Sequence, residues 1–585
     1  MFVQIMQSLA NRCRDLRSFD VFDEASLQLL LDRSRWFSLT GGLALFHQGD
    51  PPDAVYFILS GRLIIVRKDE FGDEVVGYVR AGEPVGEMSL LAKEPRSASA
   101  YALRDTELLA VDPAEAAWLL DNCADFSHAL ANSIVARARN PTSSFVRARP
   151  RVFALIGTSP SIEIESKARE LAQIIERYGK SATVIQRPAL FREGEFEEIE
   201  SGHDVILLTA RVGDSFDYRF ALRHADRFFI FARQDARPPR PFPLSVTDDS
   251  PAKKFRLVDI VMLHEGVKSG SVADWVDAVD AHRTFHMTGA RTTERLARAI
   301  AGLSVGVVMS GGGARAYAHI GAVKALRERR VPIDFLGGAS MGAVIAACVA
   351  MGWSDDEIEM RVRDAFVLSN PLGDHVMPVV AMTRGQRVEE RLKRHFGDTL
   401  IENMEIPFFC TSSEMTRGVT RIHRRGLLRD ALRASISLPG ILPPVVVDGD
   451  LLVDGAIMNN FPTDLMNSFH RGVTIGIDVA REGTISTEPF KDPPGFLSWV
   501  WRHGFRSAPP IVSLLMRAAT SRQELRHKES PADIIIAPPV GGVQLRDWKS
   551  YDVAVIDGYA STLGCLDREW PKLAAIVEAG LPTQR

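Results

Sequence analysis

The sequence predicts a multidomain α/β protein, with an N-terminal antiparallel β-barrel followed by two parallel-sheet segments. Short β-rich runs separated by glycine-bearing turns occupy residues 20–112, which is the spacing of a barrel or sandwich. Apolar strands then alternate with amphipathic helices over residues 151–290 and again over residues 303–581, which indicates parallel sheets. The length of 585 residues is enough for three or four domains.

Composition excludes several classes of protein. The chain is 46% hydrophobic and 25% charged, as globular proteins are, which rules out a disordered chain or a collagen. The 70 basic and 74 acidic residues give a net charge of −4, so we expect no nucleic-acid partner. The five cysteines form no CxxC pair, which fits a reducing compartment and gives no zinc spacing. We expect no metal in the function.

Hydropathy predicts a cytoplasmic protein that contacts a membrane only peripherally. No signal-like apolar core forms at the N-terminus, and nowhere do 18 uncharged apolar residues follow one another. A later stretch combines Phe496, Trp499, Trp501 and Phe505 with cations such as Arg502, a mixture that suits a lipid headgroup interface. A helix packed beside an active-site mouth would account for the same residues.

The first expected domain, residues 1–133, consists of the barrel with flanking helical patterns. Residues 134–151 then carry five arginines and no acidic residue, which predicts a basic linker over 134–150. A parallel α/β domain over 151–290 follows. Its first loop, GTSPSIEIESKA, lacks the GxxxxGK[ST] pattern of a phosphate loop, so we interpret this domain as a packing or spacer unit.

The last domain, residues 303–585, contains the motifs that carry chemistry. A turn of three glycines, Gly311 to Gly313, stands between an expected strand at 305–309 and an amphipathic helix. Glycines let the backbone approach a ligand closely. Backbone N–H groups at the start of a helix suit a developing oxyanion, so this turn is a candidate oxyanion site.

The segment Gly338-Ala339-Ser340-Met341-Gly342 has the form G-x-S-x-G. An apolar strand end precedes it and an alanine-rich helix follows, which is the strand–turn–helix context of a nucleophile elbow. Ser340 is therefore the candidate nucleophile. The alternative interpretation is a glycine-rich turn whose serine caps the helix.

Asp454 is the candidate base. It follows an apolar strand, in an Asp-Gly-Ala sequence, 114 residues beyond Ser340. Asp-Gly alone predicts only a turn. Ser340, Asp454 and His470 also stand in the chain order of an α/β-hydrolase triad, although a histidine near a helix C-terminus usually has an electrostatic role. We interpret His319, on the helix after the glycine turn, as structural.

These motifs, taken in order, resemble the patatin-like phospholipase family. The segments RAYAHIGAVKAL, GASMGAVIAA, ASISLPGILPPV and DWKSYDVAVIDGY resemble its neuropathy-target-esterase branch, so the resemblance covers residues 303–559. It implies a serine esterase acting on phospholipid or lysophospholipid esters, with Ser340 as nucleophile and Asp454 as base. No cofactor is then required. The residues implied for the oxyanion hole are Gly311, Gly312, Gly313, Ala314 and Arg315.

The barrel also carries a resemblance. FHQGDPPDAVYFILSGRLIIV, followed by VGEMSLLAKEPRSASA, resembles a cyclic nucleotide-binding domain. The resemblance implies that Gly86 and Glu87 bind the ribose 2′-OH, that Arg96 pairs with the cyclic phosphate and that Ser97 closes the pocket. Cyclic AMP or cyclic GMP would then be a regulatory ligand of the esterase.

One residue departs from the patatin-like pattern. The family loop reads GGGxRG, whereas this chain has Ala316 at the last position. If that position required a positive φ, Ala316 would strain the site. The departure therefore favours one alternative, a non-enzymatic cyclic-nucleotide sensor with a disabled hydrolase domain.

Overall fold

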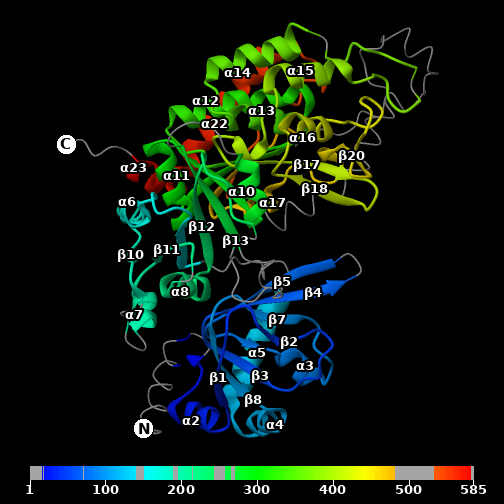
Figure 1. Ribbon diagram of the computed structural model, residues 1–585. Coiled ribbons are helices and arrows are strands. Elements are labelled where there is room, and N and C mark those ends of the chain that lie inside the picture. The colour runs from blue at the N-terminus through cyan, green and yellow to red at the C-terminus, as the bar shows by residue number, and fades with distance from the viewer. Residues whose placement is uncertain are drawn as a thin grey trace.

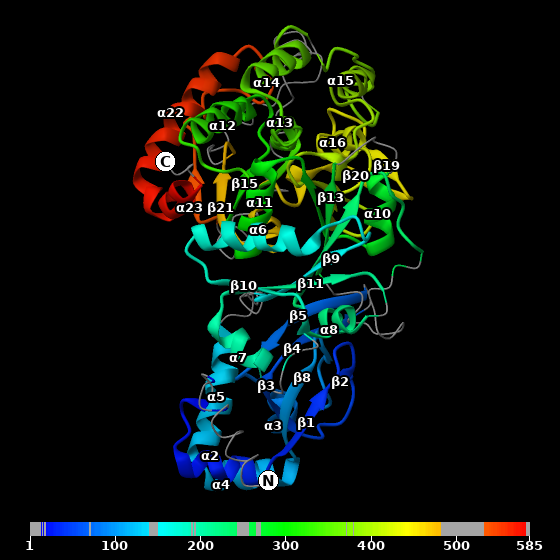
Figure 2. The same cartoon turned by 60° about the vertical axis from the view of Figure 1, so that its left-hand side comes forward.

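The computed structural model describes Cys13, Leu16 and residues 19–69, 72–139, 150–188, 191, 195–213, 215–240, 242, 257–264, 271–369, 371–377, 379–480 and 532–580. The aromatic stretch with Phe496, Trp499, Trp501 and Phe505, and its Arg502, lies outside these residues. The N-terminal β domain lies at one end of the molecule, and the middle sheet connects it to the C-terminal domain (Figures 1 and 2). Among the described residues, no helix combines the length and hydropathy needed to cross a bilayer.

The N-terminal domain is built from two four-stranded antiparallel sheets. The first has the order β1 (Arg35–Leu39), β8 (Thr106–Val111), β3 (Val55–Ser60), β6 (Pro84–Val85). The second has the order β2 (Ala44–Phe46), β7 (Ser99–Ala102), β4 (Arg62–Asp69), β5 (Gly72–Arg80). The helices are α2 (Glu24–Asp32), α3 (Glu87–Ala92), α4 (Pro113–Asn122) and α5 (Ala124–Arg139).

Strand β3 is apolar almost throughout because both of its faces are covered. Val55 and Phe57 pack in the cluster that includes side chains of α2, α4 and α5. Tyr56 and Ile58 belong to the separate cluster between the sheets. Helix α5 continues to Arg139, so residues 134–139 are helical and the predicted linker does not begin at 134. Residues 140–149 of that linker lie outside the described part of the chain.

The middle domain is a six-stranded parallel sheet. Its order is β10 (Ala182–Ile185), β11 (Val205–Arg211), β9 (Val152–Gly157), β12 (Arg227–Arg233), β13 (Leu257–Leu263), β14 (Arg283–Met287). The accompanying helices are α6 (Ile164–Arg177), α7 (Glu195–Gly202), α8 (Phe216–His224), α10 (Val272–Val279) and α11 (Ala290–Ala301). Strands buried on both faces explain the continuous apolar runs of the sequence.

The C-terminal domain has an eight-stranded mixed sheet. Its order is β19 (Val445–Val447), β20 (Asp450–Asp454), β17 (Phe408–Glu414), β16 (Phe335–Ala339), β15 (Ser304–Met309), β21 (Gly472–Ile477), β22 (Ile534–Ile536), with β18 (Val419–His423) also paired to β17. The α-helices are α12 (Ala318–Glu328), α13 (Ser340–Ala350), α14 (Asp355–Val362), α15 (Gln386–Phe396), α16 (Leu428–Ser435), α17 (Thr463–Phe469), α22 (Tyr551–Glu569) and α23 (Ala574–Ala579). Short turns of other helix types are η4 (Gly313–Tyr317), η5 (Arg363–Val367), η6 (Ile401–Asn403), η7 (Gly455–Ile457) and η8 (Trp570–Lys572).

The middle and C-terminal sheets share one apolar core. Phe285 on β14 and Phe335 on β16 contact each other with ring centroids 5.9 Å apart, and both belong to a single buried cluster. Arg298 on α11 also makes a two-pronged, buried ion pair with Asp334, with nitrogen–oxygen distances of 2.9 and 2.7 Å. The packing therefore continues across the boundary between these two parts.

Buried charges join the β domain to the middle domain. Arg62 lies 3.1 Å from Asp226, and Arg104 lies 2.7 Å from Glu200. The Asp105 amide donates to the carbonyl of Arg223, which lies at the end of α8. The two ion pairs and the backbone hydrogen bond fix the two domains to each other at this point. Loss of one member of a buried pair would leave the other charge uncompensated.

Candidate active site

Ser340 occupies a strained turn between β16 and α13. Its φ is +53°, a left-handed value that side chains other than glycine rarely adopt. The Ser340 amide donates to the hydroxyl oxygen of Ser435, at the end of α16, over 3.0 Å. The turn directs the Ser340 Oγ toward β20, as a nucleophile elbow requires.

Asp454 ends β20 beside this hydroxyl. The Ser340 Oγ donates to Asp454 Oδ2 over 2.7 Å, and Asp454 Oδ1 accepts a hydrogen bond from the Ala456 amide over 2.8 Å. The Asp454 amide donates to the carbonyl of Ser437, which follows α16. Burial disfavours the charged carboxylate and raises its pKa to about 7. A base with this pKa takes up and releases a proton near neutral pH.

The glycine turn offers fewer free donors than the sequence implied. The Gly311 amide donates to the carbonyl of Asn460, and the Ala314 amide donates to the carbonyl of Leu545. The Arg315 side chain donates from Nε to the Val543 carbonyl over 2.7 Å, so it holds the turn to the segment before α22. Among the residues that the structure describes, the Gly312 and Gly313 amides have no backbone partner, so they are the candidate donors for an oxyanion.

Position 311 requires glycine because Ser340 and Asn460 lie too close for a side chain there. A Cβ at this position would lie 2.8 Å from the Cβ of Ser340 and 2.4 Å from Asn460 Oδ1. Ala316 lies within the short helix η4 and is not among the residues with positive φ. The Cβ of Ala316 therefore causes none of the backbone strain that a left-handed position would impose.

The two histidines near these motifs have structural partners. His470 lies within 3.0 Å of Ser304 Oγ and of Thr474 Oγ1. Ser304 begins β15 whereas Gly311 follows its end, a separation of about 20 Å along extended chain. A triad through His470 is therefore not formed. His319 lies 2.9 Å from the Ser310 carbonyl, to which Nε2 donates, and burial lowers its pKa to about 4.

The structure places Arg96 in contact with Gly86, the residue before Glu87. Arg96 is buried, and its two terminal nitrogens donate to Asp53 Oδ1 (2.6 Å), the Ala54 carbonyl (2.7 Å) and the Gly86 carbonyl (2.8 Å). Glu87 is buried at the start of α3, next to Gly86. Ser97 is exposed at the surface.

This arrangement fits an anionic ligand. Among the described residues, the buried Nε of Arg96 has no hydrogen-bond partner. Gly86 has a φ of +85°, and a Cβ there would lie 2.3 Å from Arg96 Nη1. Glycine therefore keeps the space that the guanidinium needs. The N–H of Nε and the second N–H of Nη1 take no part in the three hydrogen bonds above.

Two family models match separate parts of the chain. A model of the patatin-like phospholipase family matches residues 307–466, and a model of the cyclic nucleotide-binding domain matches residues 37–123. An uncharacterized NTE family protein of Mycobacterium tuberculosis is 30% identical over 546 residues, covering 90% of this chain and 91% of the relative. The chain belongs to the NTE family.

More distant proteins are similar to all or part of this chain. Human patatin-like phospholipase domain-containing protein 6 is 24% identical over 604 residues, which cover 90% of this chain but 44% of the human protein. Among solved structures, the catabolite activator protein of Thermus thermophilus is 26% identical and matches with a TM-score of 0.20. That match covers 28% of this NTE family chain and 66% of the activator protein.

Sequence reasoning missed residues that support the candidate pair of this NTE family protein. Ser435 accepts the hydrogen bond of the Ser340 amide. Ser413 donates from Oγ to the Asp454 carbonyl over 2.8 Å, and Asn460 holds Gly311. Ser435 stands within the segment ASISLPGILPPV, which carried part of the resemblance, but the sequence alone does not show its partner.

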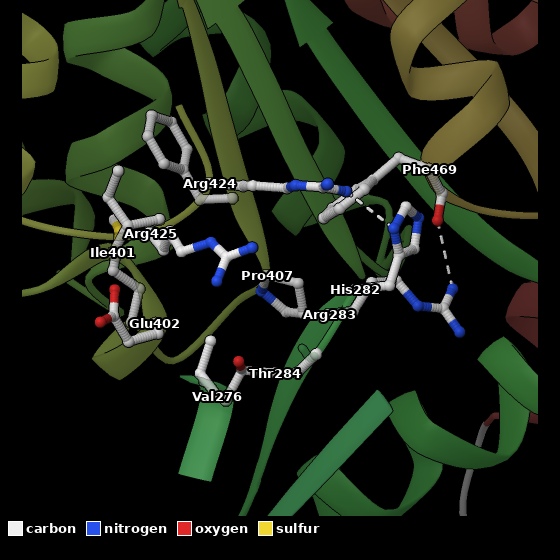
Figure 3. Close-up of a pocket in the computed structure, with 13 residues that line it drawn as sticks. Val276, His282, Arg283, Thr284, Ile401, Glu402, Pro407, Arg424, Arg425 and Phe469 are labelled. Atoms are coloured by element: carbon white, nitrogen blue, oxygen red, sulfur yellow. Dashed lines mark hydrogen bonds between the residues drawn. The ribbon is translucent and has the colours of Figure 1, made fainter. Parts of the chain in front are cut away.

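A small pocket between the middle and C-terminal domains is separate from this site (Figure 3). Arg424 lies 2.7 Å from His282, and Arg283 donates to the Phe469 carbonyl over 3.2 Å. The pocket volume is about 20 Å³, which holds about one water molecule. It is too small for an acyl ester. Among the described residues, no group of three or more His, Cys, Asp or Glu side chains is arranged to hold a metal.

Proposed function

We propose that this NTE family protein is a serine esterase of the lysophospholipase or phospholipase type. Its substrates would be acyl esters of phospholipids or lysophospholipids, and Ser340 and Asp454 would act as a dyad. The observation that carries the proposal is the 2.7 Å hydrogen bond from a strained serine to a buried carboxylate whose pKa is raised to about 7. The match of residues 307–466 to the patatin-like phospholipase model supports the substrate class.

The proposed reaction has two halves. Asp454 takes the Ser340 proton while Oγ attacks the ester carbonyl carbon, and the Gly312 and Gly313 amides stabilise the negative oxygen. The carbon–oxygen bond to the alcohol then breaks, and Asp454 returns the proton to the departing alcohol. In the second half, Asp454 takes a proton from water, the resulting hydroxide attacks the acyl-enzyme, and the fatty acid leaves as Ser340 regains its proton.

Hydrolysis of p-nitrophenyl butyrate tests this activity without requiring a membrane. We expect wild type to hydrolyse it and Ser340→Ala to lose the activity. Ser468→Ala, which removes an exposed hydroxyl on α17, is the matched control and should behave as wild type. Equal rates for wild type and Ser340→Ala would overturn the proposal.

We also propose that cyclic AMP or cyclic GMP binds the barrel and regulates the esterase. The match of residues 37–123 to the cyclic nucleotide-binding model and the unpartnered Nε of Arg96 support binding. Calorimetric titration should detect binding that Arg96→Ala abolishes and Arg67→Ala, an exposed arginine of the same barrel, retains. Nucleotide binding by a wild-type protein without esterase activity would instead support the sensor alternative.

A further inference from the structure

The most exposed apolar side chains of the described residues gather in one short stretch before α15. Val379, Met377 and Leu368 are 91%, 85% and 79% exposed, the three highest values among the large apolar side chains described. Val380, beside them, is 65% exposed. Single exposed apolar residues are ordinary on a surface, but several within a few positions of one another, such as Met377, Val379 and Val380, mark a contact with a partner.

The backbone holds this stretch in a defined shape. The Val376 amide donates to the Met382 carbonyl over 3.0 Å, and His375 and Thr383 form an antiparallel bridge. His375 and Thr383 are therefore the base of a small hairpin. We call its described residues, 375–377 and 379–383, the apolar hairpin, and Met377, Val379 and Val380 lie between its two sides. The chain leading into α15 projects from the C-terminal domain in Figure 1.

The base of the apolar hairpin is attached close to the candidate active site. The Met382 amide donates to the Gly440 carbonyl over 2.9 Å, and the Thr383 hydroxyl donates to the Ile441 carbonyl over 2.7 Å. Ser437, whose carbonyl accepts the hydrogen bond of the Asp454 amide, precedes Gly440 by three residues. Three residues span at most about 11 Å, so the base of the apolar hairpin is attached within this distance of Ser437.

Positive charge follows the hairpin directly. Residues 384–395 contain five cations and two acidic residues, a net charge of +3 in a chain whose total is −4. Arg384, Arg387 and Lys393 are exposed, and one of the two acids, Glu389, lies 3.2 Å from Arg433. An apolar tip followed by cations is complementary to acyl chains below anionic headgroups.

We propose that the apolar hairpin and the start of α15 dock the protein on a bilayer that contains anionic phospholipid. This inference deepens the proposed function, on which it rests, because it names the surface from which Ser340 receives its lipid. Met377, Val379 and Val380 enter the acyl region, while Arg384, Arg387 and Lys393 contact headgroups. The attachment at Gly440 and Ile441 then places the candidate site against the bilayer.

Sedimentation of the full chain with vesicles tests the docking. The vesicles contain phosphatidylcholine with or without phosphatidylglycerol. We expect Met377→Ser/Val379→Ser/Val380→Ser to bind at least about tenfold more weakly than wild type, since three apolar side chains lose their burial. Val553→Ser/Ile556→Ser, which removes two exposed apolar side chains from α22, is the matched control and should bind as wild type.

Four further outcomes decide the docking proposal. The preference for phosphatidylglycerol should disappear in Arg384→Gln/Arg387→Gln/Lys393→Gln. The apolar triple variant should still hydrolyse dissolved p-nitrophenyl butyrate at the wild-type rate, which shows that it is folded. Unchanged vesicle binding by that variant would overturn the docking proposal, as would a change in its oligomeric state, which would identify a second copy as the occupant.

The docking and the esterase proposal can fail separately. Vesicle binding that depends on the hairpin, with esterase activity that does not depend on Ser340, would leave the docking intact and contradict the dyad. Esterase activity lost only in Ser340→Ala, with vesicle binding indifferent to the hairpin, would leave the dyad intact and contradict the docking.

Discussion

Ser340 Oγ donates a hydrogen bond to Asp454 Oδ2 over 2.7 Å. Ser340 begins α13, Asp454 ends β20, and the two residues are 114 positions apart in the chain. The carboxylate is buried, and the second oxygen is held by the Ala456 amide. A hydroxyl and a desolvated base in direct contact form the smallest unit able to carry out nucleophilic ester cleavage.

Replacement of the base should remove most of the activity while leaving the nucleophile in place. We expect Asp454→Asn to lower kcat for p-nitrophenyl butyrate by roughly a thousandfold or more, because an amide cannot accept the Ser340 proton. Steady-state kinetics measures the effect. A variant with more than a tenth of the wild-type kcat would contradict the assignment of Asp454.

The pH dependence should report the same group. Burial raises the Asp454 pKa to about 7, and only the deprotonated carboxylate is a base. We therefore expect kcat/KM to be low in acid, to rise through a midpoint near 7 and to level off above it. A profile that is flat through neutral pH, measured where the protein is folded, would show that another group takes the proton.

The raised pKa of Asp454 also predicts that the free energy of unfolding falls as pH rises, whereas the activity rises. A carboxyl whose pKa rises from 3.8 in the unfolded chain to about 7 when folded stabilises the fold fully below 3.8 and loses this contribution as pH rises through 7. Asp454→Asn has no charge to bury, so it should be more stable than wild type at pH 8, by on the order of 4 kcal/mol. Denaturant unfolding at pH 8 and pH 4 measures the difference, which should nearly vanish at pH 4.

Gly311→Ala should lower the activity because the added Cβ would clash with Ser340 and Asn460. The added Cβ would lie 2.8 Å from Ser340 Cβ and 2.4 Å from Asn460 Oδ1, so the nucleophile or the glycine turn must move. We expect kcat to fall by roughly a hundredfold, as displacements of about 1 Å do. Gly542→Ala, where no atom lies within 4 Å of the added Cβ, is the control. Equal activity in the two variants would mean that the turn does not need its present position.

In the barrel, Gly86→Ala should abolish cyclic-nucleotide binding. Gly86 and Gly49 both have left-handed φ values, +85° and +90°, so alanine strains both backbones. Only at Gly86 would the Cβ also displace Arg96, which lies 2.3 Å away. Calorimetric titration should therefore show binding by Gly49→Ala and none by Gly86→Ala. Comparable losses in the two variants would attribute the effect to backbone strain alone.

The sequence predicted the architecture well where a strand or helix ends at a glycine or at the end of an apolar run. Glycines and apolar runs mark the strand–turn–helix around Ser340 and the end of β20 at Asp454, because those signals are read within a few residues. The sequence did not predict that residues 134–139 are helical, because an arginine-rich segment is compatible with both a solvated helix and a linker.

The sequence did not show the long-range partners of the glycine turn. The Ala314 amide donates to the Leu545 carbonyl, and Arg315 Nε donates to the Val543 carbonyl. Only the packing of the segment before α22 against the glycine turn decides this. The support of Ser340 by Ser435 likewise depends on where α16 ends relative to β16.

Labelling with a fluorophosphonate, followed by mass spectrometry of the labelled peptide, shows whether Asp454 activates Ser340. The reagent reacts only with an activated hydroxyl and remains bound. We expect one adduct, on Ser340, that forms faster as pH rises through 7 and is absent from both Ser340→Ala and Asp454→Asn. An adduct on another residue, or full labelling of Asp454→Asn, would contradict it.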